Sequence, residues 1–289
     1  MKLFIIISML FFVINCSSNK TVHKSPSDKK AELYYEHGTA KLINKKYTQA
    51  LHFFLKALEL KPKNTKIRNN LAMSYWFKNK VELAISHLKE AIEIDENNSD
   101  ARNNLASIYY QQRKFDLALI EYKKVAANLT YNRQYRTYYN MALIFNKKGE
   151  DELVAKYLEK SIKERTDYCP AHYLRGKLLY KNRRFNLALE EFHQSSLGTC
   201  IKDAGPVFWK AKTLASQKRY FRAKQMFKDA IKKFPKSGYA KRAYQEISKI
   251  TQSELLSEKV REENYRYKNN RKSLQSKQEQ PLDLETPEF

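Results

Sequence analysis

Six copies of a segment of about 34 residues follow one another between Ala31 and Ser237, and this period constrains the fold more than any other feature of the chain. The copies begin at Ala31, Thr65, Ser99, Tyr135, Cys169 and Ala204. The eighth residue of every copy is small, namely Gly38, Ala72, Ala106, Ala142, Gly176 and Ala211. The twenty-fourth residue is large and apolar, namely Phe54, Leu88, Tyr122, Leu158, Phe192 and Phe227. Because small residues let two helices approach closely and large ones fill the space against the next pair, the pattern predicts one helical hairpin per copy.

The ends of the expected helices carry matching signals. Asn64 and Asn98 stand where an N-cap should open the first helix of a copy. Pro62 and Pro235 stand where the second helix should stop. Residues 239–250 add one more amphipathic segment, which we expect to be the capping helix that a repeat array needs.

The positions of the small and aromatic residues resemble those of the tetratricopeptide repeat. One hairpin alone cannot bury its apolar face, so successive copies have to stack on one another. The resemblance therefore implies an all-α fold over residues 31–251, a superhelix of six helical hairpins plus a capping helix.

The beginning of the chain has the pattern of an export signal. An apolar run over residues 3–14 follows a single basic residue and is shorter than the ~20 residues that a membrane-spanning helix needs, so residues 1–15 are predicted to be a signal peptide. The segment Val13–Cys16 resembles the cleavage box of a bacterial lipoprotein, although Asn15 is larger than the residue usual before the cysteine. This resemblance implies that Cys16 is lipidated; the alternative is an ordinary signal peptide cut nearby.

Polar segments flank the repeats. Ser17 resembles the sorting context of outer-membrane lipoproteins, which implies the periplasmic face of the outer membrane as the location. Residues 16–30 would then be a flexible tether that starts at the lipidated cysteine. Residues 252–289 mix charges of both signs with Gln and Ser and are predicted to be a polar tail, partly helical or disordered, with Ser253–Tyr267 as its helical part.

Two further cysteines belong to the fifth copy. Cys169 opens its first helix and Cys200 follows its second helix, so both lie at the same end of an antiparallel hairpin. An oxidising periplasm favours a disulfide between them. The alternative is that they are two unrelated small residues in loops.

The first helix of each copy should line the concave side of the superhelix, with its fifth, ninth and twelfth residues directed into the groove. The candidate groove residues chosen in this way are Tyr35, Thr39, Leu42, Asn69, Met73, Trp76, Tyr110, Tyr139 and Tyr173, with Lys177 and Tyr180 beside the last of them. Exposed aromatic side chains are typical anchors for a protein partner, and Trp76 is the strongest single candidate. Some of these side chains could instead pack against the next helix.

The sixth position of three successive copies is asparagine. Asn70, Asn104 and Asn140 would place three amides along the groove, which resembles an asparagine ladder that binds the backbone of an extended peptide. The alternative is that each amide only satisfies the neighbouring backbone or the adjacent hairpin.

Nothing in the sequence indicates chemistry. The six histidines have no metal-ligand spacing, and the six glycines form no phosphate-binding loop. We therefore expect no catalytic site, no metal, no cofactor and no small-molecule substrate, and we interpret the chain as a binding protein rather than an enzyme.

The net charge of the chain is +24 at pH 7. Much of it lies where the first helix of each copy turns into the second, at Lys45, Lys46, Lys78, Lys80, Arg113, Lys114, Lys147, Lys148, Arg183, Arg184, Lys218 and Arg219. One explanation is that cations favour a helix C-terminus and keep exposed turns soluble. The other is a basic ridge that faces anionic lipid headgroups, lipid A phosphates or an acidic partner. Export excludes nucleic acid as the partner, despite the charge.

An exported, lipidated array of six such repeats resembles the PilF/PilW family, the pilotin and pilus-stability lipoproteins of type IV pilus systems. The resemblance includes the longer connection at Asn128–Gln134 and the stretches Tyr138–Ala142 and Tyr157–Ser161. It implies a protein that binds a secretin subunit through its groove and assists the localisation and assembly of that subunit in the outer membrane. The alternative is a lipoprotein that regulates cell-wall synthases or hydrolases.

Overall fold

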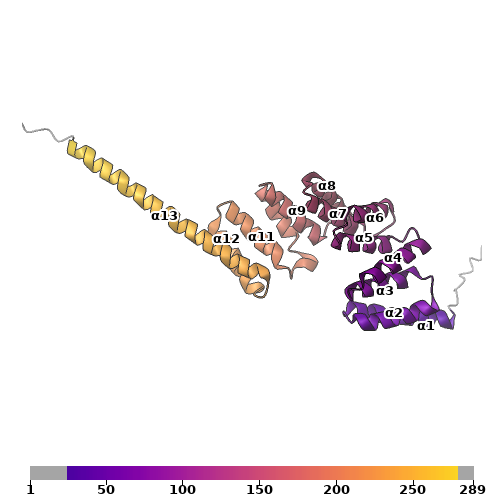
Figure 1. Cartoon of the computed structure of the whole chain (residues 1–289). Helices are drawn as coiled ribbons and strands as arrows, with labels where there is room; N and C mark the ends of the chain where they lie inside the picture. The colour runs from indigo at the N-terminus through magenta and orange to yellow at the C-terminus, as the bar shows by residue number, and fades with distance from the viewer. Residues whose placement is uncertain (1–24, 279–289) are drawn as a thin grey trace, which may run out of the picture. The chain divides into compact units, whose positions relative to one another are not determined.

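In the computed structural model, which describes residues 25–278, the regular elements of the described chain are helices that pair into hairpins (Figure 1). The first helices of the hairpins, here called A helices, are α1 (Pro26–Ile43), α3 (Thr65–Phe77), α5 (Ser99–Gln111), α7 (Gln134–Lys148), α9 (Cys169–Lys181) and α11 (Ala204–Ser216). The second helices, called B helices, are α2 (Tyr47–Leu60), α4 (Val81–Ile94), α6 (Phe115–Ala127), α8 (Asp151–Glu164), α10 (Phe185–Gln194) and α12 (Tyr220–Lys233). A short 3-10 helix, η1 (Gly198–Cys200), precedes α11, and α13 (Gly238–Gln278) follows α12. The predicted all-α fold with six helical hairpins is confirmed.

Contacts between the eighth and twenty-fourth residues hold A and B helices together. Gly38 of α1 faces the ring of Phe54 in α2, and a Cβ at position 38 would come within 2.7 Å of that ring. Phe54 is fully buried, as are the equivalent Leu88 and Leu158 in later hairpins. The absence of a side chain on one helix therefore makes room for a large side chain on the other.

The predicted helix caps are present. The side chain of Asn64 accepts hydrogen bonds from the backbone N–H groups of Lys66 and Ile67, at 3.0 and 3.1 Å. Asn98 caps α5 in the same way, since its Oδ1 accepts from the N–H of Ala101 at 3.0 Å. These bonds satisfy N–H groups that a helix N-terminus leaves without partners.

All six turns between an A helix and its B helix use the same backbone conformation. The fifteenth residue of each copy has a positive φ, with values of 57° to 61° at Lys45, Asn79, Arg113, Arg183 and Lys218 and of 80° at Gly149. This left-handed conformation suits glycine and is tolerated by asparagine, but it is sterically unfavourable for lysine and arginine. The repeat therefore fixes the turn geometry even where the side chain opposes it.

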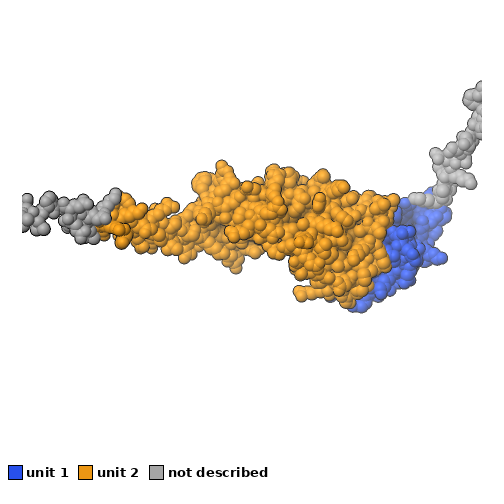
Figure 2. All heavy atoms as spheres, turned by 90° about the horizontal axis from the view of Figure 1, so that it is seen from above, with its two compact units in different colours: residues 1–105 blue, residues 106–289 orange. Residues whose placement is uncertain are grey.

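The chain divides into two compact units, residues 1–105 and residues 106–289, and the division falls within α5 (Figure 2). The core of the first unit is formed by Ala50, Phe54, Ala57, Ile67 and Leu71. The second unit has one cluster around Tyr122, Met141 and Leu158 and another around Phe208, Phe227 and Ile250.

The structure differs from the sequence expectation at both ends of the repeats. Helix α1 starts at Pro26 behind a capping box formed by Ser25 and Asp28, so residues 26–30 of the predicted tether are helical. At the other end, the expected capping helix is only the first part of α13, which continues through residue 278 and extends beyond α12 in Figure 1. Residues 251–278 have no apolar periodicity, yet they lack Pro and Gly and are rich in Glu, Lys and Arg, which favour a helix intrinsically.

Other predicted features lie outside the described residues. These are the signal peptide over residues 1–15, the lipidation of Cys16 and the last part of the tail. Among the described helices, none combines the length and the apolar character that crossing a bilayer requires.

Candidate functional site

In the first unit, five candidate groove residues from three A helices are joined by hydrogen bonds. Asn104 of α5 donates from Nδ2 to Oδ1 of Asn69 in α3, at 2.8 Å. Asn69 donates from Nδ2 to Oδ1 of Asn70, at 3.3 Å. Asn70 in turn donates to the hydroxyls of Tyr35 and Thr39 in α1, at 3.2 and 3.4 Å. We call these five residues the amide chain.

The amide chain bears on the expected asparagine ladder. Asn70 and Asn104 are half-buried, and both bond to side chains of the preceding A helix. The amides of Asn70 and Asn104 thus join neighbouring hairpins. This agrees with the second interpretation given for them, in which each amide bonds to the adjacent hairpin. An asparagine amide offers two donors and two acceptor sites, so a peptide backbone can exchange with or add to these bonds.

A pocket opens beside Tyr35, between the middle of α1, the C-terminal end of α2 and the N-terminal end of α3. It is lined by Ala31, Glu32, Tyr35, Lys61, Asn64, Lys66 and Ile67. Lys61 at its rim forms an ion pair with Asp28, at 2.8 Å. The pocket combines an aromatic face with charged and amide groups, a combination suited to a side chain of a bound protein segment.

The other candidate residues of the first unit do not join the amide chain. Leu42 packs against the apolar core around Phe54. Met73 and Trp76 lie half-buried on α3, one turn and two turns beyond Asn69. Trp76 is therefore partly accessible and lies on the same helix as two members of the amide chain.

In the second unit, Asn140 points to a buried tyrosine. The hydroxyl of Tyr122 lies 2.9 Å from Oγ of Ser107 and also bonds to the side chain of Asn140. Burial strongly raises the pKa of Tyr122, so its hydroxyl stays protonated and can donate. Asn140 thus bonds inward to the B helix of the preceding hairpin.

Tyr110 and Tyr139 pack against the core that surrounds Tyr122. The ring of Tyr139 meets that of Tyr168 edge to face, with centroids 5.5 Å apart. Burial raises the pKa of Tyr139 to about 12. Tyr110 and Tyr139 are therefore half-buried and contribute to packing, and their exposed parts remain candidate contacts for a protein partner.

Tyr173 belongs to a larger group of aromatic and cationic side chains around Trp209. Nζ of Lys177 lies between two rings, 5.8 Å from the centroid of Tyr173 and 5.6 Å from that of Trp209. Lys212 lies over the same indole at 5.5 Å, and the ring of Tyr180 meets it edge to face at 5.2 Å. We call these five residues, from α9 and α11, the Trp209 cluster.

The Trp209 cluster offers cations and half-buried aromatic faces on one surface. A lysine over an aromatic ring gains about 0.5–1 kcal/mol at an exposed site, which orders the ammonium group. The hydroxyl of Tyr173 is fixed by that of Tyr239 in α13, at 2.8 Å. Ordered ammonium groups beside aromatic faces suit a partner segment that carries a carboxylate next to an aromatic or apolar residue.

Trp209 and Lys212 were missed among the sequence-predicted site residues. Trp209 is the sixth residue of the sixth copy, the position that holds Asn70, Asn104 and Asn140 in earlier copies. Extending that row to the last hairpin would have found it. Lys212 is the ninth residue of the same copy and would have followed from the groove positions used for the other copies.

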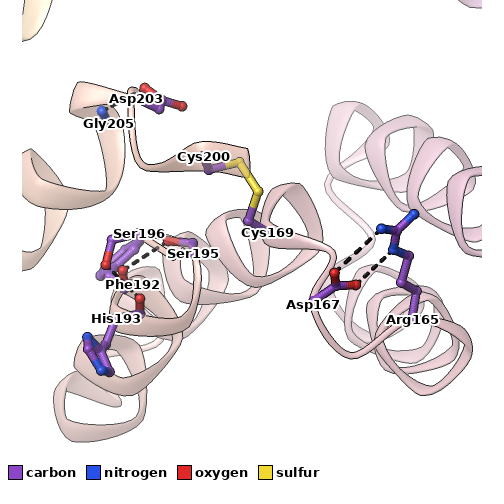
Figure 3. Close-up of a disulfide and its surroundings, with 10 residues drawn as sticks. All are labelled: Arg165, Asp167, Cys169, Phe192, His193, Ser195, Ser196, Cys200, Asp203 and Gly205. Carbon is purple, nitrogen blue, oxygen red and sulfur yellow. Dashed lines mark hydrogen bonds and ion pairs between the residues drawn. A yellow bond between two sulfur atoms is a disulfide. The ribbon is translucent and has the colours of Figure 1, made fainter. Parts of the chain in front are cut away.

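Cys169 and Cys200 form a disulfide, with Cα atoms 6.2 Å apart (Figure 3). Figure 3 shows that the bond ties η1 to the N-terminal end of α9, ahead of the point where Asp203 caps α11 through the N–H of Gly205. Both α9 and α11 supply residues of the Trp209 cluster. The disulfide therefore restrains the long connection that leads into one half of that cluster.

One charged network is buried in the same hairpin. Nδ1 of His172 lies 2.9 Å from the carboxylate of Glu191, and its Nε2 lies 2.8 Å from the carbonyl oxygen of Thr166. Arg175 donates to the other oxygen of Glu191 at 2.5 Å. The partners come from this hairpin and from the connection before it, so the network has a structural role. In the described part of the chain, no group of His, Cys, Asp and Glu has the arrangement of a metal site.

Comparison with known protein families identifies the repeats. A tetratricopeptide repeat model matches residues 31–64, and a second TPR repeat model matches residues 77–113. The chain thus carries tetratricopeptide repeats, a fold that binds protein partners and generally lacks enzymatic activity. No curated protein matches the chain.

Several solved structures share the fold. PilF of Pseudomonas aeruginosa is 19% identical, with a TM-score of 0.68 over 79% of this chain and 100% of that chain. PilW, described as a widely conserved type IV pilus biogenesis factor, is 17% identical, with a TM-score of 0.65 over 74% of this chain and 98% of that chain. The Cut9–Hcn1 hetero-tetramer of APC/C is 15% identical, with a TM-score of 0.64 over 77% of this chain and 43% of that chain. At these identities the likeness shows the fold alone.

Proposed function

We propose that this tetratricopeptide repeat chain is an outer-membrane lipoprotein scaffold of type IV pilus biogenesis. It binds a secretin subunit through the surface of its A helices and assists the localisation and assembly of that subunit. The observation that supports this function best is the likeness to PilF and PilW, which extends over 100% and 98% of those two chains. Because the superposition extends over nearly the whole of each pilus protein, the likeness includes the succession of hairpins and not only a single repeat.

The A helices supply the contacts for a protein partner. In the first unit the amide chain and the pocket beside Tyr35 offer hydrogen-bonding groups next to an aromatic ring. In the second unit the Trp209 cluster offers cations next to aromatic faces. A secretin segment that runs over either surface would bond its backbone to the amides or place an acidic side chain beside Lys177, since Lys212 is already paired with Glu246 at 3.7 Å.

Cys16 supplies the location in this proposal. A thioether-linked and acylated cysteine would insert several acyl chains, each contributing about 0.8 kcal/mol per buried CH₂. More than one chain is enough for stable anchoring. The lipid therefore keeps the scaffold at the membrane while the A helices hold the secretin subunit.

Secretin assembly in cells tests the two parts of the proposal separately. We would compare cells that produce the wild-type chain, Cys16→Ser or Trp76→Ala, and measure secretin multimers in fractionated outer membranes. Cys16→Ser should leave partner binding intact but misplace the secretin, whereas Trp76→Ala should keep the chain in the outer membrane and lower the amount of multimer. Normal multimers with Trp76→Ala would contradict the groove assignment, and co-purification with cell-wall enzymes in place of a secretin would contradict the pilus function.

A further inference from the structure

The turns between A and B helices in the second unit form one continuous edge of the molecule. Lys148 donates to Asp116 of the preceding hairpin at 2.8 Å, and Lys181 donates to Asp151 at the same distance. Gln217 then donates to Asn186 at 2.7 Å. Since each turn touches the next one, the four turns lie side by side, and we call residues 112–114, 147–150, 182–184 and 217–219 the turn edge.

The turn edge is strongly basic. Its cationic residues are Arg113, Lys114, Lys147, Lys148, Arg183, Arg184, Lys218 and Arg219, and each of them is exposed. Glu150 is the acidic residue of the same four turns. Asp116 and Asp151, which follow in the first turns of B helices, are engaged by lysines of neighbouring hairpins. The edge therefore presents a surplus of positive charge to the solvent.

Local folding energetics oppose six of these eight cations, whereas Lys147 and Lys148 lie in the last turn of α7, where the helix dipole favours them. Arg113, Arg183 and Lys218 occupy the left-handed backbone position, which is sterically unfavourable for a residue with a side chain. Lys114, Arg184 and Arg219 occupy the N-cap of a B helix without capping it, where the helix dipole disfavours a cation. Solubility alone would be served equally by lysines on exposed helix faces, so it does not explain charges at these positions.

Exposed apolar side chains accompany the charge. Leu117, Leu187 and Phe221 lie in the first turns of α6, α10 and α12, and their side chains are 46%, 48% and 71% exposed. Apolar side chains next to lysine and arginine are typical of a surface that enters the headgroup region of an anionic bilayer.

We propose that the turn edge of the second unit binds the surface of an anionic lipid bilayer, with its lysines and arginines on lipid phosphates and its exposed apolar side chains among the headgroups. This contact does not require the lipid on Cys16 and does not use the A-helix residues that are proposed to bind a protein. It orients the repeats on the membrane, whereas the acylated cysteine only tethers them.

The left-handed turns provide a variant that removes charge without harming the fold. Arg113→Gly, Arg183→Gly and Lys218→Gly replace three cations by the residue that this backbone favours. A matched control removes three exposed lysines from the opposite ends of the hairpins, with Lys163→Gln, Lys232→Gln and Lys236→Gln. Both variants of the full chain have the same net charge and the same N-terminus.

Sedimentation with vesicles compares the three proteins. The probes are phosphatidylcholine vesicles with and without phosphatidylglycerol, at low and high salt, with soluble polyglutamate as competitor. Each lysine or arginine near an anionic surface contributes roughly fivefold to binding, so the triple glycine variant should bind phosphatidylglycerol vesicles about 100-fold more weakly than wild type. The control should bind like wild type, and high salt should weaken wild-type binding.

Three results would overturn the proposal. The first is equal binding to vesicles with and without phosphatidylglycerol. The second is an equal loss in the glycine variant and the control, because net charge and not the turn edge would then determine binding. The third is binding to polyglutamate without binding to vesicles, which would identify an acidic protein as the partner of this edge.

Discussion

Gly176 of α9 lies against the ring of Phe192 in α10 so closely that a Cβ at position 176 would come within 2.7 Å of a ring carbon. The ring is fully buried and stacks on Trp209, with centroids 6.2 Å apart. The contact therefore joins the packing of the fifth hairpin to the Trp209 cluster. Any residue larger than glycine at this position has to displace the ring.

Gly176→Ala should destabilise the protein. Overpacking costs about 1–3 kcal/mol, while alanine gains about 1 kcal/mol in helix propensity, so the free energy of unfolding should fall by about 1 kcal/mol. Gly238→Ala is the control, since a Cβ at position 238 has no atom within 4 Å. Thermal unfolding measures both, and a stabilised Gly176→Ala would show that the ring can move at little cost.

The left-handed turns allow two opposite predictions. Arg183→Gly should raise the free energy of unfolding by about 0.5–1 kcal/mol, because glycine removes the steric cost of a φ of 57° but also makes the unfolded chain more flexible. Gly149→Ala, at a φ of 80°, should lower it by about 1 kcal/mol. Urea unfolding at neutral pH would test the pair, and effects of the same sign in both variants would contradict this interpretation of the turns.

The network of His172 and Glu191 should make stability depend on pH. Burial alone would lower the pKa of His172, but its hydrogen bonds to Glu191 and Thr166 outweigh burial and raise the pKa above 6.5. Burial alone would raise the pKa of Glu191, but its bonds to His172 and Arg175 hold it below 4.5. The stabilisation that His172 contributes is fully present below pH 6.5 and is lost as the pH rises through the pKa of His172 in the folded protein. The stabilisation that Glu191 contributes is present above pH 4.5 and is lost as the pH falls through the pKa of Glu191 in the folded protein.

The network should therefore stabilise the protein most between about pH 4.5 and 6.5. Thermal melting of the wild type should show a midpoint that falls as the pH rises above this window. Glu191→Gln should melt at a lower temperature and show a weaker dependence on pH there. An unchanged pH profile in Glu191→Gln would mean that other groups cause the dependence.

Removing the disulfide should destabilise the second unit. The bond closes a loop with a sequence separation of 31, which corresponds to roughly 3–4 kcal/mol in the chain-entropy model. Cys200→Ser should therefore lower the unfolding midpoint, and a reducing agent should lower that of the wild type by a similar amount. The reducing agent should have no effect on Cys200→Ser; a further decrease there would point to another reducible bond.

The hairpins could be predicted from the sequence because the contacts that define them are local and recur. The eighth and twenty-fourth residues of a copy, such as Gly38 and Phe54, meet within one hairpin, so their spacing is sufficient to place both helices. The N-caps at Asn64 and Asn98 mark helix starts by a side-chain type that the sequence displays directly.

Other features could not be predicted in the same way. The length of α13 depends on intrinsic propensity without an apolar pattern, so a search for periodicity stops at Ile250. The bonds of Asn70 depend on which side chains of α1 face α3, and the neighbours of Trp209 come from α9, α10 and α11. Such contacts between hairpins follow from three-dimensional packing. The basic residues of the turn edge were visible, but the backbone strain that makes them unusual was not.

Binding of a purified, detergent-solubilised secretin subunit to the full chain tests most directly whether the A helices bind a protein. In a calorimetric titration, wild type should bind, and Trp76→Ala and Asn70→Ala should each weaken binding about tenfold, as removal of an interface anchor does. Phe221→Ala, an exposed aromatic residue on a B helix, should bind like wild type. Absence of binding by the wild type, or binding of Trp76→Ala and Asn70→Ala as tight as that of the wild type, would contradict a secretin-binding surface on the A helices.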